Sequence, residues 1–356
     1  MRCLLLSRYG LLGASSRVRS YQYLDFLRTQ GIDVIVASLL SDDYLRRLYA
    51  GQPRPWRAIW KSYLHRLHSL LYSRHYHLLW IEYELFPWLP AWIERLLSYA
   101  SIPYVVDYDD AVFHRYDLHP SRIIRALLSR KIDRVMSLAT LVIVGNDYLA
   151  ERARLAGARR VENLPTVVDL TRYPLKVEQR NSTFSIGWIG SPTTAPYLRL
   201  VQPALAEIGR RRRVRLVLVG SPYAELNGVP IEVRHWSTDS EAKAIQDFDV
   251  GIMPLPDNAW ARGKCGYKLI QYMASARPPI ASPVGINRVL IAHGTNGFLA
   301  TSETDWVDSL TFLCDHPEER HRMGQVGRRM VEERYCLEVT GPRLAALLRE
   351  AAGRFN

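Results

Sequence analysis

The chain has 356 residues, of which 48% are hydrophobic and 23% are charged. At about 150 residues per domain, this length suggests about two domains, each large enough to bury a core. The composition excludes a disordered chain and a membrane protein with many spans. The excess of 47 Lys and Arg over 35 Asp and Glu, a formal charge of +12, favours an anionic partner: nucleic acid, an anionic membrane face or a phosphate-bearing small molecule.

The cysteines and the apolar runs indicate where the protein is expected to act. Cys3, Cys265, Cys314 and Cys336 lie far apart without C-x-x-C spacing, which favours free thiols in a reducing compartment. The first apolar run is too short for a signal peptide and meets Arg8. No stretch approaches the ~20 uncharged apolar residues of a spanning helix. We therefore expect a cytoplasmic protein.

Short apolar runs alternate with longer segments of helical period, which is typical of a parallel sheet covered on both faces. The strands predicted in the first half are Cys3–Ser7, Asp33–Ser38, Leu78–Glu82, Tyr104–Tyr108 and Leu141–Gly145. The helices predicted between them are Ser15–Gln30, Pro87–Ala100, Pro120–Leu138 and Tyr148–Ala156.

A polar stretch at Pro165–Asn181 is interpreted as the interdomain linker, after which the alternation restarts. The strands predicted in the second half are Phe184–Gly190, Arg215–Gly220, Ile231–His235, Val250–Leu255 and Pro279–Pro283. The helices predicted there are Thr194–Gly209, Ser240–Asp247 and Tyr267–Ser275. The tail Thr304–Arg354 is helical and either covers its own sheet or crosses back to the first domain.

Two glycine-containing loops follow strands, and the carboxyl ends of parallel strands are where open α/β sheets bind ligands. The first loop contains Gly13 and leads into a helix that carries Arg17 near its start. Because a cation there opposes the helix dipole, a nearby anion would compensate. The second loop contains Gly190 and Ser191. Either loop alone could be a plain turn, but the pair suggests two halves of a nucleotide site.

Residues 254–274 form the segment richest in binding signals: a strand end, a Gly-rich basic loop and a helix. Lys264 precedes this helix and Lys268 lies in its first turn beside Tyr267, so both ammonium groups could contact a diphosphate. Gln271 lies one turn further and could reach a ribose hydroxyl. The strand-to-helix turn at Gly285 could hold a base or a phosphate. The alternative is an ordinary solvated basic loop.

Acidic residues end the strand at Tyr104–Tyr108. Carboxylates such as Asp107, Asp109 and Asp110 at that position, with His114 nearby, could act as a base, orient sugar hydroxyls or bind a metal through the D-x-D spacing. We favour contacts with acceptor hydroxyls, and the alternative is that these carboxylates cap the next helix.

A basic and aromatic stretch extends from Arg54 to Trp80 and is roughly amphipathic. It could lie on an anionic membrane. The commoner outcome is a helix packed by its apolar face with its cations solvated.

The glycine loops, and above all the segment Gly263-Lys-Cys-Gly-Tyr-Lys-Leu-Ile-Gln-Tyr-Met-Ala followed by Pro279-Ile-Ala-Ser-Pro-Val-Gly, resemble glycosyltransferase family 4. The resemblance covers about Cys3–Tyr335. It implies the GT-B fold, which consists of two Rossmann-like α/β domains facing across a cleft, with a C-terminal helix that crosses back to the N-terminal domain. It also implies a nucleotide-sugar donor held by the C-terminal domain, an acceptor held by the N-terminal domain, and retaining, metal-independent transfer.

The sequence departs from the family pattern at three places. Members usually carry two glutamates eight positions apart, and this chain has Gly263 and Gln271 there, with Asp257 as a candidate substitute. The basic pair that members often place after the first strand of the second domain is absent from 190–196, so Lys264 and Lys268 are expected to replace it. Where many members have a histidine near the acceptor, this chain aligns Asp109 or Asp110.

The predicted domains are residues 1–170 for the acceptor, 171–335 for the donor, and 336–356 for the returning helix. We predict transfer of a hexose from a nucleoside diphosphate sugar to a hydroxyl of a glycan or lipid-linked acceptor. No cofactor, metal or nucleic acid is expected, while an anionic membrane surface is a further candidate partner. The alternatives are a sugar-nucleotide epimerase of similar fold and a non-catalytic basic module that binds nucleic acid or membrane.

Each predicted site residue has a role. The predicted catalytic residues are Asp109, Asp110, Lys264 and Lys268. The predicted donor-binding residues are Gly13, Arg17, Gly190, Ser191, Asp257, Lys264, Tyr267, Lys268, Gln271 and Gly285. The predicted acceptor-binding residues are Asp107, Asp109 and His114.

Overall fold

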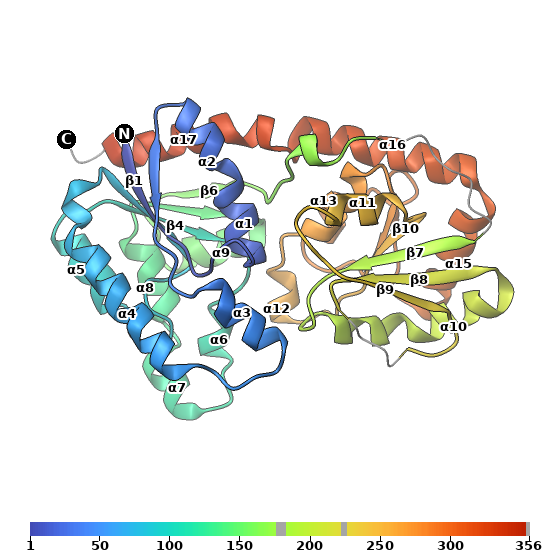
Figure 1. The fold of residues 1–356 in the computed structure, drawn as a ribbon, viewed down its shortest axis with the longest axis horizontal. Coiled ribbons are helices and arrows are strands. Elements are labelled where there is room, and N and C mark those ends of the chain that lie inside the picture. Colours follow the sequence, from blue (N-terminus) through green and yellow to red (C-terminus); the bar gives the residue numbers. More distant parts are fainter. Residues whose placement is uncertain (176–182, 222–225, 354–356) are drawn as a thin grey trace. The chain divides into compact units, whose positions relative to one another are not determined.

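A computed structural model of the protein describes residues 1–175, 183–221 and 226–353. These residues form two compact units (Figure 1). The first contains residues 1–166, 263–265 and 337–353, and the second contains 167–262 and 266–336 where described. Each unit holds a six-stranded parallel sheet flanked by helices. The predicted fold class, two Rossmann-like α/β domains, is confirmed.

The sheet of the first unit has the strand order β2-β1-β3-β4-β5-β6. Its strands are β1 Arg2–Leu6, β2 Asp33–Val36, β3 Leu78–Glu82, β4 Tyr104–Tyr108, β5 Leu141–Val144 and β6 Val161–Asn163. Every residue of β3, β4 and β5 is buried, as expected for central strands covered on both faces. The register pairs Glu82 at the end of β3 with Asp107 in β4. This pairing brings carboxylates together at the carboxyl edge.

Helices cover both faces of this sheet. They are α1 Ala14–Arg19, α2 Leu24–Thr29, α3 Asp42–Tyr49, α4 Trp56–Leu71, α5 Trp92–Tyr99, α6 His114–Asp117, α7 Arg122–Leu128, α8 Lys131–Leu138, α9 Asp147–Leu155 and α17 Leu337–Gly353, with short 3-10 turns η1 Tyr21–Tyr23 and η2 Ser73–His75. The last helix returns to the first unit, as predicted: the hydroxyl groups of Thr340 and Tyr23 lie 2.8 Å apart, and Gly341 packs on Phe26.

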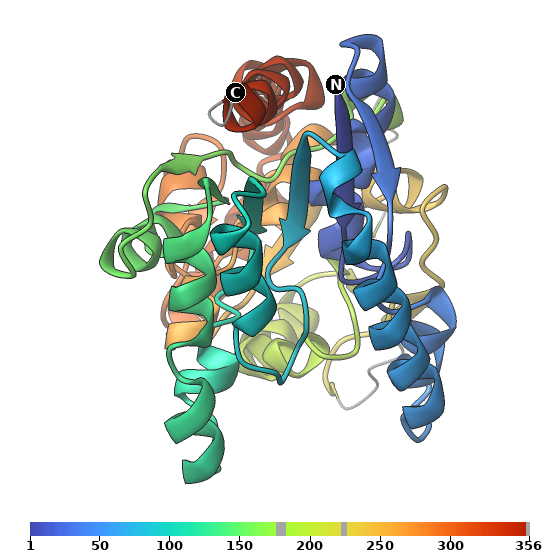
Figure 2. The same ribbon diagram turned by 90° about the vertical axis from the view of Figure 1, so that its left-hand side faces the viewer.

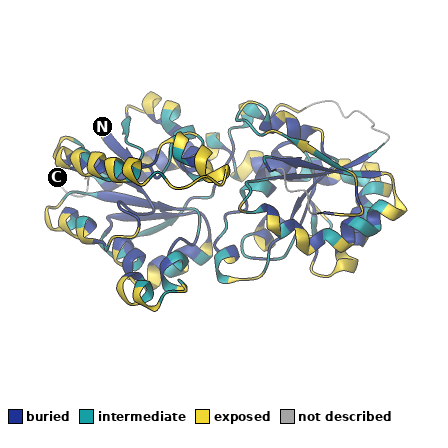
Figure 3. Cartoon of the chain, turned by 60° about the horizontal axis from the view of Figure 1, so that its bottom comes forward, coloured by how far each residue is buried: buried dark blue, intermediate teal, exposed yellow. Residues whose placement is uncertain are grey.

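The sheet of the second unit has the order β12-β11-β10-β7-β8-β9. Its strands are β7 Phe184–Ile189, β8 Val214–Val219, β9 Ile231–Arg234, β10 Val250–Met253, β11 Pro279–Ala281 and β12 Phe298–Leu299. Its helices are η3 Leu170–Arg172, η4 Ala195–Val201, α10 Gln202–Arg211, α11 Glu241–Gln246, α12 Ala259–Arg262, α13 Tyr267–Ala274, α14 Asn287–Leu290, α15 Glu303–Asp315 and α16 Pro317–Arg334. Burial is concentrated in the strands of both units, and exposed residues lie on the outer sides of the helices (Figure 3).

Three predicted helices are interrupted, each for a local reason. The helix predicted at Ser15–Gln30 breaks at Ser20, whose hydroxyl donates to the carbonyl of Ser16 and competes with the backbone ladder. The helix predicted at Thr194–Gly209 begins as the 3-10 segment η4, because Pro203 has no N–H for an α-helical bond. The helix predicted at Pro120–Leu138 divides into α7 and α8 around Arg130, whose ψ of 11° lies outside the helical range.

Two further differences concern strand β6 and the linker. The prediction omits β6, because this short edge strand contains Glu162 and Asn163 and lacks an apolar run. The predicted linker Pro165–Asn181 lies partly outside the described residues, from 176 onward. Its first part packs into the second unit, where Tyr173 is buried and Val168 forms a bridge with Cys336.

Candidate functional site

At the carboxyl edge of the second sheet, glycine backbone lies directly beneath a lysine ammonium group. Gly190 follows β7 and Gly220 follows β8, and an added Cβ at Gly220 would lie 2.7 Å from the carbonyl oxygen of Gly190. An added Cβ at Gly190 would lie 2.8 Å from Lys268 Nζ and 2.5 Å from the Trp188 ring. Because Gly190 has no side chain, its backbone and the ammonium group of Lys268 can approach closely.

Lys268 lies in the first turn of α13 and is half-buried. Its Nζ is 4.4 Å from the centroid of the Trp188 ring, a cation–π contact, and 3.3 Å from Thr194 Oγ1. The N-cap residue Gly266 has a φ of 68° and contributes no side-chain cap. The amides of Tyr267 and Lys268 belong to the first turn, where N–H groups lack partners within the helix. A helix N-terminus with a lysine is suited to a phosphate.

Two other predicted donor residues lie in strand-to-helix turns of this unit. In the turn after Gly190, the Thr194 amide donates to the Ser191 carbonyl at 3.0 Å, and the hydroxyl groups of Ser191 and Thr193 lie 2.7 Å apart. Gly285 follows β11, and an added Cβ there would lie 2.6 Å from the carbonyl oxygen of Arg262. Their contacts with a donor stay predictions.

Gln271 belongs to a buried network of polar side chains. It is 2% exposed, and its Nε2 donates to the Tyr173 hydroxyl at 2.9 Å. The Tyr173 hydroxyl donates to Glu241 Oε1 at 3.5 Å, and Trp236 Nε1 donates to Glu241 Oε2 at 2.9 Å. In this structure Gln271 positions Tyr173, and its predicted ribose contact stays a prediction.

Asp257 lies on the surface of the second unit. Its carboxylate accepts a hydrogen bond from Arg262 Nε at 2.6 Å, and 55% of its side chain is exposed. The hydrogen bond from Arg262 lowers the pKa of Asp257 below its ordinary value, so this carboxylate stays ionised. Its role as a substitute for the missing glutamate stays a prediction.

In the first unit, Asp107 at the end of β4 forms a buried ion pair with Arg19 of α1. Arg19 Nε donates to Asp107 Oδ1 at 2.8 Å, and Arg19 Nη1 donates to the Leu164 carbonyl at 2.8 Å. Burial raises the pKa of Asp107 to about 6, although Arg19 lowers it. Asp107 Oδ2 is buried and accepts no hydrogen bond from the residues that the structure describes.

The next two aspartates have different partners. Asp109 accepts a hydrogen bond from the hydroxyl of Tyr83, a residue held at the left-handed φ of 62°. The Tyr108 hydroxyl fixes this backbone by donating to the Tyr83 carbonyl at 2.7 Å. Asp110 pairs with Lys264, with Nζ and Oδ1 3.4 Å apart. Desolvation raises the pKa of Asp110 to about 6, while Lys264 lowers it.

Glu82 is a further carboxylate at this edge of the sheet, where it pairs in register with Asp107, and it was not predicted from the sequence. Its Oε2 accepts from Ser16 Oγ at 2.6 Å and from the Arg8 amide at 2.8 Å, whereas its Oε1 is buried without a hydrogen bond from any described group. Burial raises the pKa of Glu82 to about 7, against these two hydrogen bonds. Glu82 could have been predicted, because it is a carboxylate at the end of a buried strand, which is the feature from which Asp107 was predicted. We call Glu82, Asp107, Asp109 and Asp110 the carboxylate cluster.

The remaining predicted residues of the first unit have local partners. Gly13 donates to the Gly10 carbonyl at 3.1 Å, and Arg17 is buried with Nη1 donating to the Leu11 carbonyl at 3.2 Å. The ring nitrogens of His114 lie 2.8 Å from Asp117 Oδ1 and 2.8 Å from the Tyr148 hydroxyl. Their contacts with donor or acceptor stay predictions.

The two predicted diphosphate lysines belong to different units. Residues 263–265 are part of the first unit, where the amide of Asn146 donates to the carbonyls of Gly263 at 2.9 Å and Lys264 at 3.0 Å. An added Cβ at Gly263 would lie 2.4 Å from Ala111 Cβ, so this loop packs closely. Lys264 therefore joins the carboxylate cluster, and Lys268 joins the glycine backbone of the second unit.

A comparison with family profiles finds a match within the second unit. The family profile described as Glycosyl transferases group 1 matches residues 183–316, which include Gly190, Lys268 and Gly285. Residues 183–316 are therefore similar to this family. The resemblance inferred from the sequence is confirmed. A search of the curated proteins finds no match.

Solved structures of glycosyltransferases match nearly the whole chain. Sucrose-phosphate synthase from Thermosynechococcus elongatus has a TM-score of 0.72 at 13% identity, over 98% of this chain and 98% of that one. HepE from Anabaena, solved in complex with UDP-glucose, has a TM-score of 0.68 at 15% identity, over 98% of this chain and 100% of that one. WaaG, a glycosyltransferase involved in lipopolysaccharide biosynthesis, has a TM-score of 0.69 at 12% identity, over 98% of this chain and 99% of that one. These matches show the GT-B fold.

Proposed function

We propose that this protein is a glycosyltransferase that moves a hexose from a nucleoside diphosphate sugar to a hydroxyl of a glycan or lipid-linked acceptor. The observation that carries the proposal is the half-buried Lys268 ammonium above the backbone of Gly190, in a region that matches a glycosyl transferase family. A cation beside the amides of a helix N-terminus stabilises the negative charge that grows on a departing diphosphate. This stabilisation is the chief task of such an enzyme.

We assign the donor to the second unit and the acceptor to the carboxylate cluster of the first unit. In this assignment Asp109 and Asp110 hold the acceptor hydroxyl, and Lys264 holds Asp110 in place at 3.4 Å. The raised pKa of Asp110, about 6, suits a group that receives a proton near neutral pH. We further propose that transfer is retaining and uses neither a metal ion nor a cofactor besides the donor.

The related structures narrow the choice of donor. HepE is solved with UDP-glucose, which supports a uridine diphosphate hexose as the first donor to test. WaaG is involved in lipopolysaccharide biosynthesis, which supports an acceptor among glycolipids or cell-surface polysaccharides.

The proposal is tested by following donor consumption with NMR. The protein is incubated with UDP-, GDP- and ADP-linked hexoses, with and without a mixture of glycan and lipid-linked acceptors. We expect one donor to release its nucleoside diphosphate, with a new glycosidic anomeric signal that depends on the acceptor. Conversion of the donor into an isomeric sugar nucleotide without acceptor would instead show an epimerase. No change in any donor, together with no thermal stabilisation by any nucleoside diphosphate, would contradict the proposal.

A further inference from the structure

Helix α4 of the first unit exposes a continuous apolar stripe. Trp56, Trp60, Leu64, Leu67 and Leu71 are 62%, 65%, 65%, 43% and 74% exposed. At about 100° of rotation per residue, these five positions fall within an arc of about 80° on the helix surface. The interpretation of this stretch as a helix packed by its apolar face is therefore wrong for these five residues. Figure 2 views the side of the first unit on which α4 lies.

The orientation of α4 is fixed by contacts on the face next to the stripe. Arg66 is 2% exposed, and its Nη2 donates to the carbonyls of Ser7 at 2.5 Å and Ala37 at 3.0 Å. The Tyr63 hydroxyl donates to the Pro87 carbonyl at 2.7 Å. Leu70 is buried as well. Because these contacts hold the neighbouring face of α4, centred about 90° from the stripe, against the rest of the unit, the apolar stripe cannot rotate inward.

The surroundings of the stripe are positively charged. Residues 44–81 contain no Asp or Glu and seven Lys or Arg. On α4, Arg57, Lys61, His65 and His68 are exposed and lie along one side of the stripe. A helix with tryptophans and leucines on one strip and cations beside it is typical of proteins that lie on an anionic membrane.

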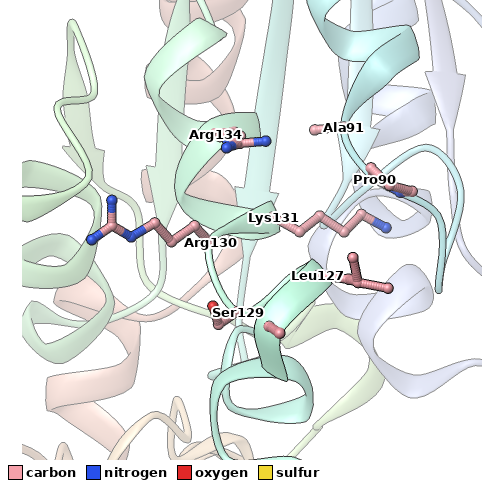
Figure 4. A pocket seen from close by; sticks show the side chains of 8 residues that line it. Pro90, Ala91, Leu127, Ser129, Arg130, Lys131 and Arg134 are labelled. Atoms are coloured by element: carbon pink, nitrogen blue, oxygen red, sulfur yellow. The ribbon is translucent and has the colours of Figure 1, made fainter. Parts of the chain in front are cut away.

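Exposed apolar side chains continue on elements that pack around the loop 83–91. This loop contacts α4 through Pro87, and the ring of its Trp88 packs on Tyr116 of α6 at 5.4 Å. Its end forms a cavity of about 180 Å³ with Leu127 of α7 and Arg134 of α8 (Figure 4). Exposed apolar residues on this loop, on α5 directly after it and on α7 include Trp88, Leu89, Trp92, Leu96, Ile123 and Leu127.

We propose that this face of the first unit, centred on the α4 stripe, docks on an anionic lipid bilayer. Trp60 and Leu64 enter the boundary between headgroups and acyl chains, and Arg57 and Lys61 contact lipid phosphates. A second copy of the chain fits less well, since a symmetric contact through this face would place the same cations opposite one another. Within the described residues no helix has the length and apolar character to cross a membrane. The inference is independent of the proposed function.

The test is flotation of the full-length protein with vesicles of phosphatidylcholine, alone or with 30% phosphatidylglycerol (about one anionic lipid in three, enough to create a negative surface potential). We expect binding to the anionic vesicles that weakens with salt, and a blue shift of tryptophan fluorescence on binding. The variant Trp60→Ser, Leu64→Ser is expected to bind at least about tenfold more weakly. The variant Arg57→Ser, Lys61→Ser should lose about fivefold for each cation on anionic vesicles.

The matched control is Leu200→Ser, Val289→Ser in the second unit, where both side chains are also exposed and apolar. It should bind vesicles like the wild type, and thermal melting should show all three variants folded. Failure of the wild-type protein to float with anionic vesicles would overturn the inference. Equal binding by the stripe variant and the control would also overturn it, as would a wild-type dimer in sedimentation that the stripe variant alone abolishes.

Discussion

Replacing Lys268 with alanine is expected to lower the affinity for nucleoside diphosphates by about tenfold to a hundredfold. The ammonium group lies above the Gly190 backbone and beside the first turn of α13, and a hydrogen bond to a charged group contributes about 1.5–3 kcal/mol. The measurement is isothermal titration calorimetry with UDP, GDP and ADP on wild type and variant. Turnover should fall in parallel, because the same charge stabilises the departing diphosphate.

The matched control for this prediction is Lys243→Ala, which removes an exposed lysine from α11 of the same unit. It leaves the overall charge equal to that of Lys268→Ala, so a general electrostatic effect would appear in both. We expect wild-type affinity for the control. If Lys268→Ala bound nucleoside diphosphates with unchanged affinity and had a normal melting temperature, the result would contradict diphosphate binding at this position.

Replacing Glu84 with glutamine is expected to lower the free energy of unfolding by about 3–5 kcal/mol. The buried carboxylate forms ion pairs with Lys131, with Arg8 at 3.3 Å and with Arg115 at 3.8 Å, and it accepts from the Tyr116 hydroxyl at 2.7 Å. Without its charge, buried cations are left uncompensated. Equilibrium unfolding in urea measures the loss, and Glu151→Gln, an exposed pair with Arg154, serves as a control expected to change little.

The effect of Glu84 should also depend on pH with a defined sign. Burial alone would raise the pKa of Glu84, but Lys131 and Arg8 lower it below its ordinary value of 4.5. A depressed pKa stabilises the folded state above the ordinary value, and that stabilisation is lost as the pH falls through the folded-state pKa. The difference between wild type and Glu84→Gln should therefore shrink below about pH 4.5. A difference that stays constant down to pH 3 would contradict this account.

The sheets could be predicted from the sequence because their strands are short runs of apolar residues between helical segments. Leu78–Glu82 and Tyr104–Tyr108 were predicted with the bounds that the structure shows. Strand β6 could not be found in this way, since an edge strand pairs on one side only and tolerates Glu162 and Asn163. The break at Ser20 depends on a side chain that competes with its own helix, which apolar periodicity does not report.

Site residues that lie in a continuous strand, turn and helix could be predicted from the sequence. Site contacts between segments that are distant in the sequence could not. Gly190 and Lys268 stand in recognisable strand-to-helix turns. The ion pair of Arg19 with Asp107 joins residues 88 positions apart, and no local sequence pattern predicts it. Lys264 and Lys268 are near neighbours in sequence, yet packing of Gly263 against Ala111 assigns the first lysine to the other unit. Tertiary contacts decide such cases.

A crystal structure of the protein with UDP, or with whichever nucleoside diphosphate stabilises it most, tests the central claim most directly. The account predicts that a phosphate oxygen lies about 2.7–3.1 Å from Lys268 Nζ and close to the Gly190 backbone. A diphosphate bound elsewhere on the chain, with Lys268 still resting on Trp188 and touching no ligand, would contradict it.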